Sequence, residues 1–216
     1  DCLSPIGENE LTKGLQKEIP ADFYTSVTRQ PNVYRGFPFL IEVGIAYGGS
    51  LDKEGQVRLL RFANRVPLLY QQGACAIARA VQETNWKAYG LHQSGENIPV
   101  GPAAIVIHMA SVWVPFTSEA KDAVAHYDEI IKEVKLAVQE CGRKLNAYIR
   151  KNVRAKEAQE RFSLFEKYIP ELADALAELT GKEKQPIEMH LKAILKKGAV
   201  ELLAQANGES HDRKEK

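Results

Sequence analysis

Apolar residues gather in three short runs in the first half of the chain, and Gly or Pro follows each run. Residues 37–47 alternate in part and are rich in Phe, Ile, Val and Tyr before Gly48 and Gly49. Residues 57–62 show a similar pattern, and residues 103–114 form a longer β-branched run that Pro115 ends. Such runs are typical of β-strands, because a proline cannot donate a hydrogen bond to a neighbouring strand. The pattern predicts three strands.

Helical patterns lie before and between these strands. Small apolar residues at 74–82 predict a helix that lies close on a sheet, and residues 8–18 predict a short helix. Residues 85–91 predict a short strand or a turn. A strand, a helix and a strand in this order favour a βαβ unit with a right-handed crossover. We therefore expect an α+β fold with two layers, in which helices pack on one face of a small sheet.

The second half of the chain is predicted to be almost entirely helical. Thr117 and Ser118 suit the N-cap of a helix, and Glu119 places a carboxylate in its first turn. Apolar residues then recur at three-four spacing, and neither Gly nor Pro occurs between Gly142 and Pro170. A helix over residues 128–168 would be roughly 60 Å long, which is longer than a small domain can cover.

The remaining breakers divide the end of the chain. Pro170 and Pro186 are each expected to open a helix, and Gly181 is expected to cap the helix between them. The expected organisation is a linker at 1–30, a βαβ core at 31–128, a long stalk helix at 129–169, C-terminal helices at 170–206 and a disordered polar tail at 207–216.

Composition excludes several classes of function. The net charge is +1, so the overall charge does not indicate a nucleic-acid-binding protein. Three cysteines without metal-ligand spacing, together with the lack of a signal-like or membrane-length apolar segment, favour free thiols and a cytoplasmic location. The five histidines are scattered, and no Gly-rich phosphate loop is present. We therefore predict no metal site and no complete catalytic site in this chain.

Lys121 is the first candidate for a functional residue. It falls in the first turn of the predicted helix, where the helix dipole disfavours a cation. That position indicates an anion facing the ammonium group. The alternative is an ordinary solvated lysine.

Two further features combine positive charge with a local pattern. The segment NWKAY flanks Lys87 with the aromatic residues Trp86 and Tyr89, which suits a phosphate backbone. Alternatively, the two rings simply pack the domain. No acidic residue interrupts the predicted helix from 143 to 156, so its basic residues form a stripe that can bind DNA non-specifically or remain a solvated face. The basic candidates are Arg143, Lys144, Arg150, Lys151 and Arg154.

Several longer segments carry a family resemblance. They are NVYRGFPFLIEVGIAYGG (32–49), LLRFANRVPLLYQQGACAI (59–77), NWKAY (85–89), PVGPAAIVIHMASVWVPFTSEAK (99–121) and LAVQECGRKL (136–145). Together they resemble the transducer domain of the B subunit of DNA topoisomerase VI, a type IIB topoisomerase. The likeness covers roughly residues 1–145 in family order, and it is looser beyond.

The resemblance implies specific roles for three parts of the chain. Lys121 matches the family's switch lysine, which contacts the γ-phosphate of ATP held with Mg²⁺ in a GHKL ATPase domain that this chain lacks. Trp86, Lys87 and Tyr89 match a WKxY motif linked to DNA engagement. The expected partners are the A subunit of topoisomerase VI, a second copy of the B subunit, and double-stranded DNA, with no membrane.

The resemblance also implies a function for the whole chain. It would relay ATP binding and hydrolysis to the DNA-cleaving A subunit for strand passage, as part of a topoisomerase, without being catalytic alone. The competing interpretation is a non-enzymatic adaptor or nucleic-acid-binding module with a helical arm.

Overall fold

The chain divides into two compact units, residues 1–147 and 148–216, and the long helix α3 (Asp128–Thr180) runs from the first into the second. The computed structural model describes residues 2–206, with side chains described up to Gly198. The predicted disordered tail at 207–216 lies outside the described residues.

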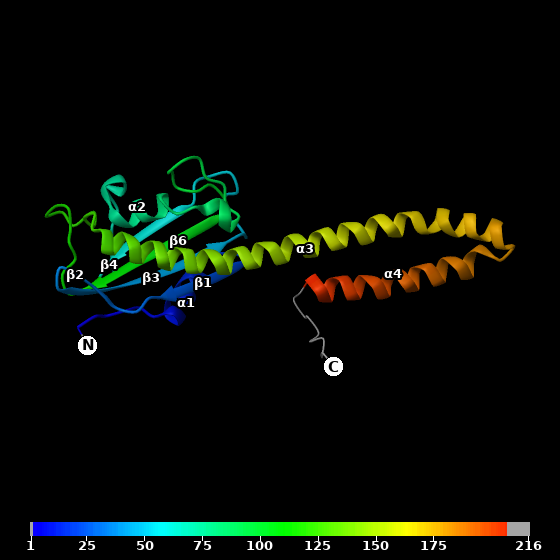
Figure 1. Cartoon of the computed structure of the whole chain (residues 1–216), viewed down its shortest axis with the longest axis horizontal. Helices are drawn as coiled ribbons and strands as arrows, with labels where there is room; N and C mark the ends of the chain where they lie inside the picture. Colours follow the sequence, from blue (N-terminus) through cyan, green and yellow to red (C-terminus); the bar gives the residue numbers. More distant parts are fainter. Residues whose placement is uncertain (1, 207–216) are drawn as a thin grey trace, which may run out of the picture. The chain divides into compact units, whose positions relative to one another are not determined.

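The first unit is built on a six-stranded mixed sheet (Figure 1). β3 and β6 pair antiparallel at its centre, from Phe39 opposite Ser111 to Tyr47 opposite Ala103. The strand order is β1-β3-β6-β4-β5, and β2 also pairs with β3. The strands are β1 (Phe23–Thr28), β2 (Asn32–Tyr34), β3 (Phe37–Tyr47), β4 (Arg58–Ala63), β5 (Val66–Pro67) and β6 (Ala103–Ser111).

The predicted strands are present with small shifts. β3 has the predicted bounds, β4 lies one residue later than predicted, and β6 ends at Ser111 rather than at residue 114. The predicted linker at 1–30 contains a further strand, because β1 pairs with β3 along its whole length. β1 mixes Thr and Ser with its apolar residues, so its apolar pattern is too weak to indicate a strand.

The predicted βαβ unit consists of β4, α2 (Ala76–Gln82) and β6, and the two strands pair in parallel. Its crossover does not have the expected right hand. With the strands pointing up and α2 facing the viewer, β6 lies to the left of β4 (Figure 1). β5 occupies the other edge of β4 as a hairpin partner, so β6 pairs in the gap between β3 and β4.

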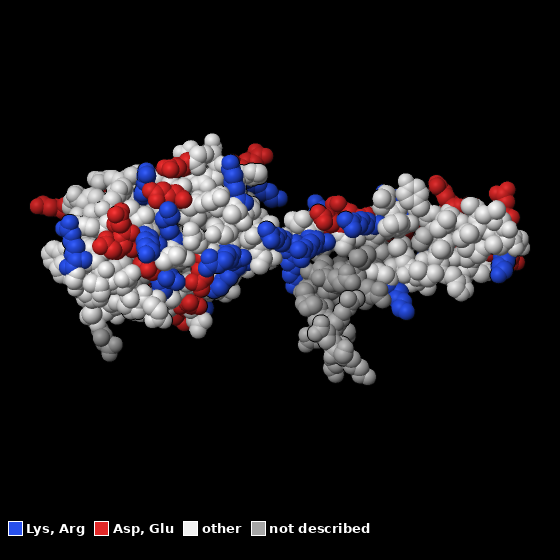
Figure 2. Space-filling view, in the orientation of Figure 1, with Lys and Arg blue, Asp and Glu red and all other residues white. Residues whose placement is uncertain are grey.

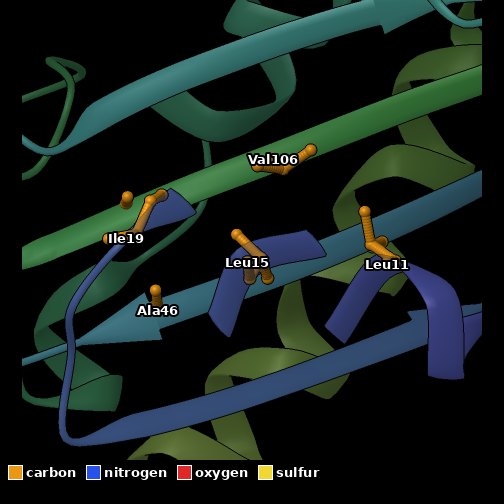
Figure 3. Close-up of a cluster of buried hydrophobic side chains, with 6 residues drawn as sticks. Leu11, Leu15, Ile19, Ala46 and Val106 are labelled. Carbon is orange, nitrogen blue, oxygen red and sulfur yellow. The ribbon is translucent and has the colours of Figure 1, made fainter. Parts of the chain in front are cut away.

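Helices cover both faces of the sheet. The two-layer prediction placed helices on one face only. α2 and the first part of α3 lie on that face, and the Cys141 thiol on α3 donates to the Val43 carbonyl at 3.6 Å. Burial raises the pKa of this thiol to about 12. α1 (Glu8–Glu18), which has its predicted bounds, covers the opposite face (Figure 3). The helix on the opposite face is a layer that the prediction did not include. Its leucines approach Gly44 so closely that a Cβ there would lie 2.7 Å from Leu15 Cδ1.

In the second unit α3 continues beyond the predicted stalk. Pro170 does not open a new helix, because it lies inside α3. A proline removes one intrahelical hydrogen bond, and the helix continues past it with Ile169 and Ala173 buried. Gly181, at φ 67°, ends the helix as predicted. α4 (Lys184–Ala206) begins two residues before Pro186.

A buried pair of polar side chains crosses the central strands of the sheet. Glu42 on β3 lies opposite His108 on β6, both side chains have zero exposure, and Glu42 Oε2 and His108 Nδ1 are 2.7 Å apart. The Arg65 amide donates to His108 Nε2 at 3.0 Å, so the ring proton is on Nδ1 and is donated to Glu42. The carboxylate also accepts the Ile6 and Gly7 amides at 2.8 and 2.7 Å.

These contacts decide the charge state of Glu42. Burial alone would raise its pKa, but the hydrogen bonds from His108, from the two amides and from the Thr28 hydroxyl outweigh burial and lower the pKa from 4.5 to about 2. Because the folded pKa is the lower one, the charged carboxylate stabilises the fold above pH 4.5. This contribution is lost as the pH falls toward 2.

Replacing Glu42 with Gln should therefore destabilise the first unit. At pH 7 we expect Glu42→Gln to lower the free energy of unfolding by about 3 kcal/mol, because buried donors lose a charged acceptor. The variant should also lose the wild-type fall in stability between pH 4.5 and 2. Urea unfolding followed by circular dichroism measures both effects. Glu10→Gln, at an exposed carboxylate, is the matched control; equal stabilities of the two variants would contradict the prediction.

Candidate functional site

Lys121 lies in a loop rather than in a helix. The predicted helix start at Thr117 and Ser118 is wrong, because α3 begins at Asp128. The Lys121 amide donates to the Ser118 carbonyl at 3.2 Å and closes a tight turn. Lys121 itself has φ 57°, in the left-handed region, and its side chain is exposed. Within the described residues its ammonium group forms no ion pair.

A short β-like stem holds this turn. Phe116 and Val124 form an antiparallel bridge. The Thr117 amide donates to the Ala123 carbonyl at 2.9 Å, and the Ala125 amide donates to the Pro115 carbonyl at 2.6 Å. Ala123 and Val124 have zero exposure. Burial of these two apolar residues explains why the segment folds into a stem instead of continuing as a helix.

The stem is attached to the start of α2. The Val124 carbonyl accepts the Ala76 amide at 2.8 Å, and the Val124 amide donates to the Cys75 thiol at 3.5 Å. Cys75 and Ala76 also have zero exposure. The Lys121 turn is therefore fixed at its base to the βαβ unit, while its tip faces solvent.

The WKAY segment forms a 3-10 helix, η2 (Trp86–Tyr89), where a short strand or turn was predicted. Trp86 has zero exposure, and its indole N–H donates to the Val81 carbonyl at 2.8 Å. Tyr89 is half-buried and meets Trp86 edge to face at 6.2 Å between ring centroids. Trp86 therefore has no exposed surface for a phosphate, and Lys87 is the member of the motif that presents a charge to solvent.

The Tyr89 ring lies directly against α3. A Cβ at Gly142 would be 2.7 Å from Tyr89 Cδ2, so only glycine allows this approach. Lys135 on α3 also forms a 3.2 Å ion pair with Glu83, just after α2. Both contacts bind the first part of α3 to the segment that carries Lys87.

The basic candidates on α3 belong to both units. In the first unit Arg143 is exposed, and the Lys144 ammonium donates to the Ser26 carbonyl at 3.3 Å, which holds its side chain against the sheet. In the second unit Arg150, Lys151 and Arg154 are exposed. Figure 2 shows basic side chains gathered on α3.

Other classes of site are not evident in the part of the chain that the structure describes. No group of three or more His, Cys, Asp or Glu residues has the geometry to hold a metal ion there. None of the helices in the same part combines the length and apolar content that a membrane crossing requires.

The sequence of the first unit and the start of the second matches a known family. Residues 1–161 of the 216-residue chain match the family described as "Topoisomerase VI B subunit, transducer". The chain belongs to this family. Its membership confirms the resemblance carried by the sequence motifs.

Curated relatives include archaeal proteins named as the B subunit of type 2 DNA topoisomerase 6. The chain is 52% identical to the one from Methanococcoides burtonii over 183 residues, which is 85% of the chain and 29% of the relative. It is 46% identical to the one from Methanosarcina mazei over 209 residues, 97% of the chain and 34% of the relative. The chain thus spans about a third of the length of these relatives.

Similarity to solved structures is weaker. A crystal structure of the 43K ATPase domain of Thermus thermophilus gyrase B in complex with an aminocoumarin aligns with a TM-score of 0.40 and 14% identity. The alignment covers 72% of this chain and 44% of the gyrase chain. A likeness of this degree adds nothing to the family assignment.

The contact between Tyr89 and Gly142 gives a stability prediction. Gly142→Ala should destabilise the first unit by about 1–3 kcal/mol, because the added methyl group displaces the Tyr89 ring from α3. Better helix propensity offsets only about 1 kcal/mol of that loss. Urea unfolding measures the change. Gly14→Ala in α1, where no atom lies within 4 Å of the added Cβ, is the control and should be neutral or stabilising. A Gly142→Ala variant as stable as this control would refute the contact.

Proposed function

We propose that this chain is the transducer of a type IIB topoisomerase B subunit, which relays the nucleotide state of an ATPase domain to the DNA-cleaving A subunit. The observation that carries the proposal is the Lys121 turn, which presents an exposed ammonium group, unpaired among the described residues, on a loop fixed at its base to the βαβ unit. Family membership supports it. The nucleotide, ATP with Mg²⁺, would be held mainly by an ATPase domain outside this chain.

The chemistry of a lysine suits this role. Its ammonium group is a compact point charge with three donors, which matches a terminal phosphate. The contact exists while the γ-phosphate is present and disappears when the phosphate leaves. A contact made in only one of two states shifts the equilibrium between them, as a nucleotide switch requires. α3 begins at Asp128, shortly after the turn, and would carry the movement of the sheet domain toward the A subunit.

The remaining assignments concern partners. ATP binding would bring two B subunits together through the ATPase domains, and double-stranded DNA would be the substrate in the cytoplasm. Exposed cations of this chain can meet DNA phosphates; they are Lys87, Arg143, Arg150, Lys151 and Arg154. Trp86 and Tyr89 would hold Lys87 in place from inside the domain. Lys144 is partly engaged by Ser26 and would contribute less.

The switch role of Lys121 can be tested in the heterotetramer of full-length A and B subunits. Lys121→Asn removes the cation but suits the left-handed backbone, because Asn tolerates positive φ. We expect ATP-dependent relaxation of supercoiled DNA to fall by on the order of a hundredfold. Assembly of the heterotetramer, measured by gel filtration, should be unchanged.

Two matched variants complete that test. Lys121→Arg keeps a cation and should retain more activity than Lys121→Asn. Lys132→Gln removes an exposed lysine from α3, outside the turn itself, and it should relax DNA like the wild type. Wild-type relaxation by Lys121→Asn would exclude the switch role.

The basic residues of the second unit predict a salt dependence. Reversing Arg150, Lys151 and Arg154 to Glu should weaken DNA binding by the heterotetramer. It should also reduce the slope of log K against log salt by about 2–3, because each phosphate contact contributes about 0.9. Fluorescence anisotropy over a salt series measures the slope. Reversal of the exposed Lys13, Lys17 and Lys53 makes the same change in net charge and is the control. A slope equal to that of the control would remove the three residues from the DNA path.

A further inference from the structure

The loop between β5 and α2 presents two adjacent apolar side chains to solvent. Leu69 is 71% exposed and Tyr70 is 68% exposed. The whole segment from Val66 to Ala78 carries no charged residue. Single exposed apolar residues are normal on a protein surface. Leu69 and Tyr70 are adjacent and lie on a loop without charged side chains, so together they form a small apolar surface.

The loop is held rigidly from below. Arg61 on β4 is 4% exposed, and its Nη2 donates to the carbonyls of Leu68 and Tyr70, both at 2.9 Å. Leu68 is buried, and its amide donates to the Arg61 carbonyl at 2.8 Å. The backbone then turns through Gln71 at φ 50°, a conformation that non-glycine residues rarely adopt. Leu69 and Tyr70 are thus pre-organised to project outward.

The structural support for this loop has a cost. Arg61 Nη1 is buried without a hydrogen-bond partner, the only such side-chain atom recorded among the described residues. A buried donor left unpaired is unfavourable by about 1–3 kcal/mol. The guanidinium nevertheless stays beneath the loop, bonded to carbonyls on both sides of Leu69.

The loop and the Lys121 turn share one base. The loop ends at Cys75 and Ala76, and these two residues are the ones that hydrogen-bond to Val124 in the stem of the Lys121 turn. Figure 1 shows the segments that precede α2 and α3 at the same end of the sheet. The Lys121 turn and the loop that carries Leu69 and Tyr70 are thus joined through Cys75 and Ala76 at one end of the sheet.

We propose that Leu69 and Tyr70 form an apolar contact with the nucleotide-holding domain of the same B subunit, in the state in which Lys121 contacts the phosphate. This inference rests on the proposed function. The relatives are about three times as long as this chain, so they contain much that lies outside it. The loop favours a protein as its occupant, because it carries no charged side chain between Val66 and Ala78 to meet DNA phosphates. Its shared base with the Lys121 turn favours the domain that holds the nucleotide.

The contact would supply what Lys121 alone cannot. A long, flexible side chain fixes one point of an interface but not its orientation. A rigid apolar anchor fixes the orientation. Because this loop is already ordered in the free domain, binding loses less conformational entropy. Tyrosine is among the residues that contribute most to such interfaces when truncated. The phosphate would then select the state in which Lys121 contacts it. The apolar contact would fix the orientation of the two domains in that state.

Photo-crosslinking in the full-length heterotetramer tests the partner directly. The photoreactive amino acid p-benzoylphenylalanine replaces Tyr70 in the B subunit, and mass spectrometry identifies the crosslinked peptides. We expect crosslinks to the nucleotide-holding domain that increase at least about fivefold when a non-hydrolysable ATP analogue is added. Crosslinks to the A subunit or to DNA, or crosslinks that do not respond to the analogue, would overturn the inference. The same amino acid at Val33, which is 53% exposed on β2, is the control.

Activity separates this inference from the proposed function. Leu69→Ser with Tyr70→Ser should lower ATP-dependent relaxation about tenfold or more, while Val33→Ser should leave it unchanged. If Lys121→Asn is inactive but the loop variant relaxes DNA normally, the loop contact is refuted and the switch stands. If Lys121→Asn is fully active while the crosslink still depends on nucleotide, the switch is refuted and the loop contact stands.

Discussion

The pairing of β3 with β6 supports every other part of the first unit, and a buried charge lies across it. Glu42 and His108 face each other on these strands with no exposure. The carboxylate also receives amides from the segment before α1, while the imidazole receives the Arg65 amide in the β4–β5 turn. A buried ion is tolerated only when its hydrogen bonds are complete. The need to complete them joins the N-terminal segment, both central strands and the β4–β5 hairpin.

The Lys121 turn follows directly from β6, one of the two central strands. β6 ends at Ser111, whose amide is held by the Asn64 side chain at 2.9 Å. The chain then forms the stem of the Lys121 turn, attaches to the start of α2 and enters α3. The cation, the apolar loop and the long helix thus all extend from one end of one sheet. The turn is joined to the βαβ unit by the backbone hydrogen bond from Ala76 to Val124 and by the bond from the Val124 amide to the buried Cys75 thiol.

Much of this architecture can be predicted from local sequence pattern. The predictions that failed concern features that depend on contacts between residues distant in the sequence. β3 has its predicted bounds because a long apolar run that ends at two glycines defines it locally, and α1 has its predicted bounds with Leu11 and Leu15 on its buried face. The segment around Ser118 was predicted as a helix start because Thr, Ser and Glu fit a cap, whereas burial of Ala123 and Val124 decided otherwise. The burial of Trp86, the α1 layer and the left-handed crossover depend on pairing between distant segments. The structural role of Arg61 could not be foreseen either, since one arginine in a strand gives no signal of its partners.

The left-handed conformation of Lys121 has an evolutionary consequence. A non-glycine residue in this region costs of the order of 1 kcal/mol or more, and Gly or Asn would occupy it more cheaply. Mutation toward either residue is therefore favoured by stability. In the proposed switch role, selection for the ammonium group of Lys121 would have to exceed the gain in stability that Gly or Asn offers at this position.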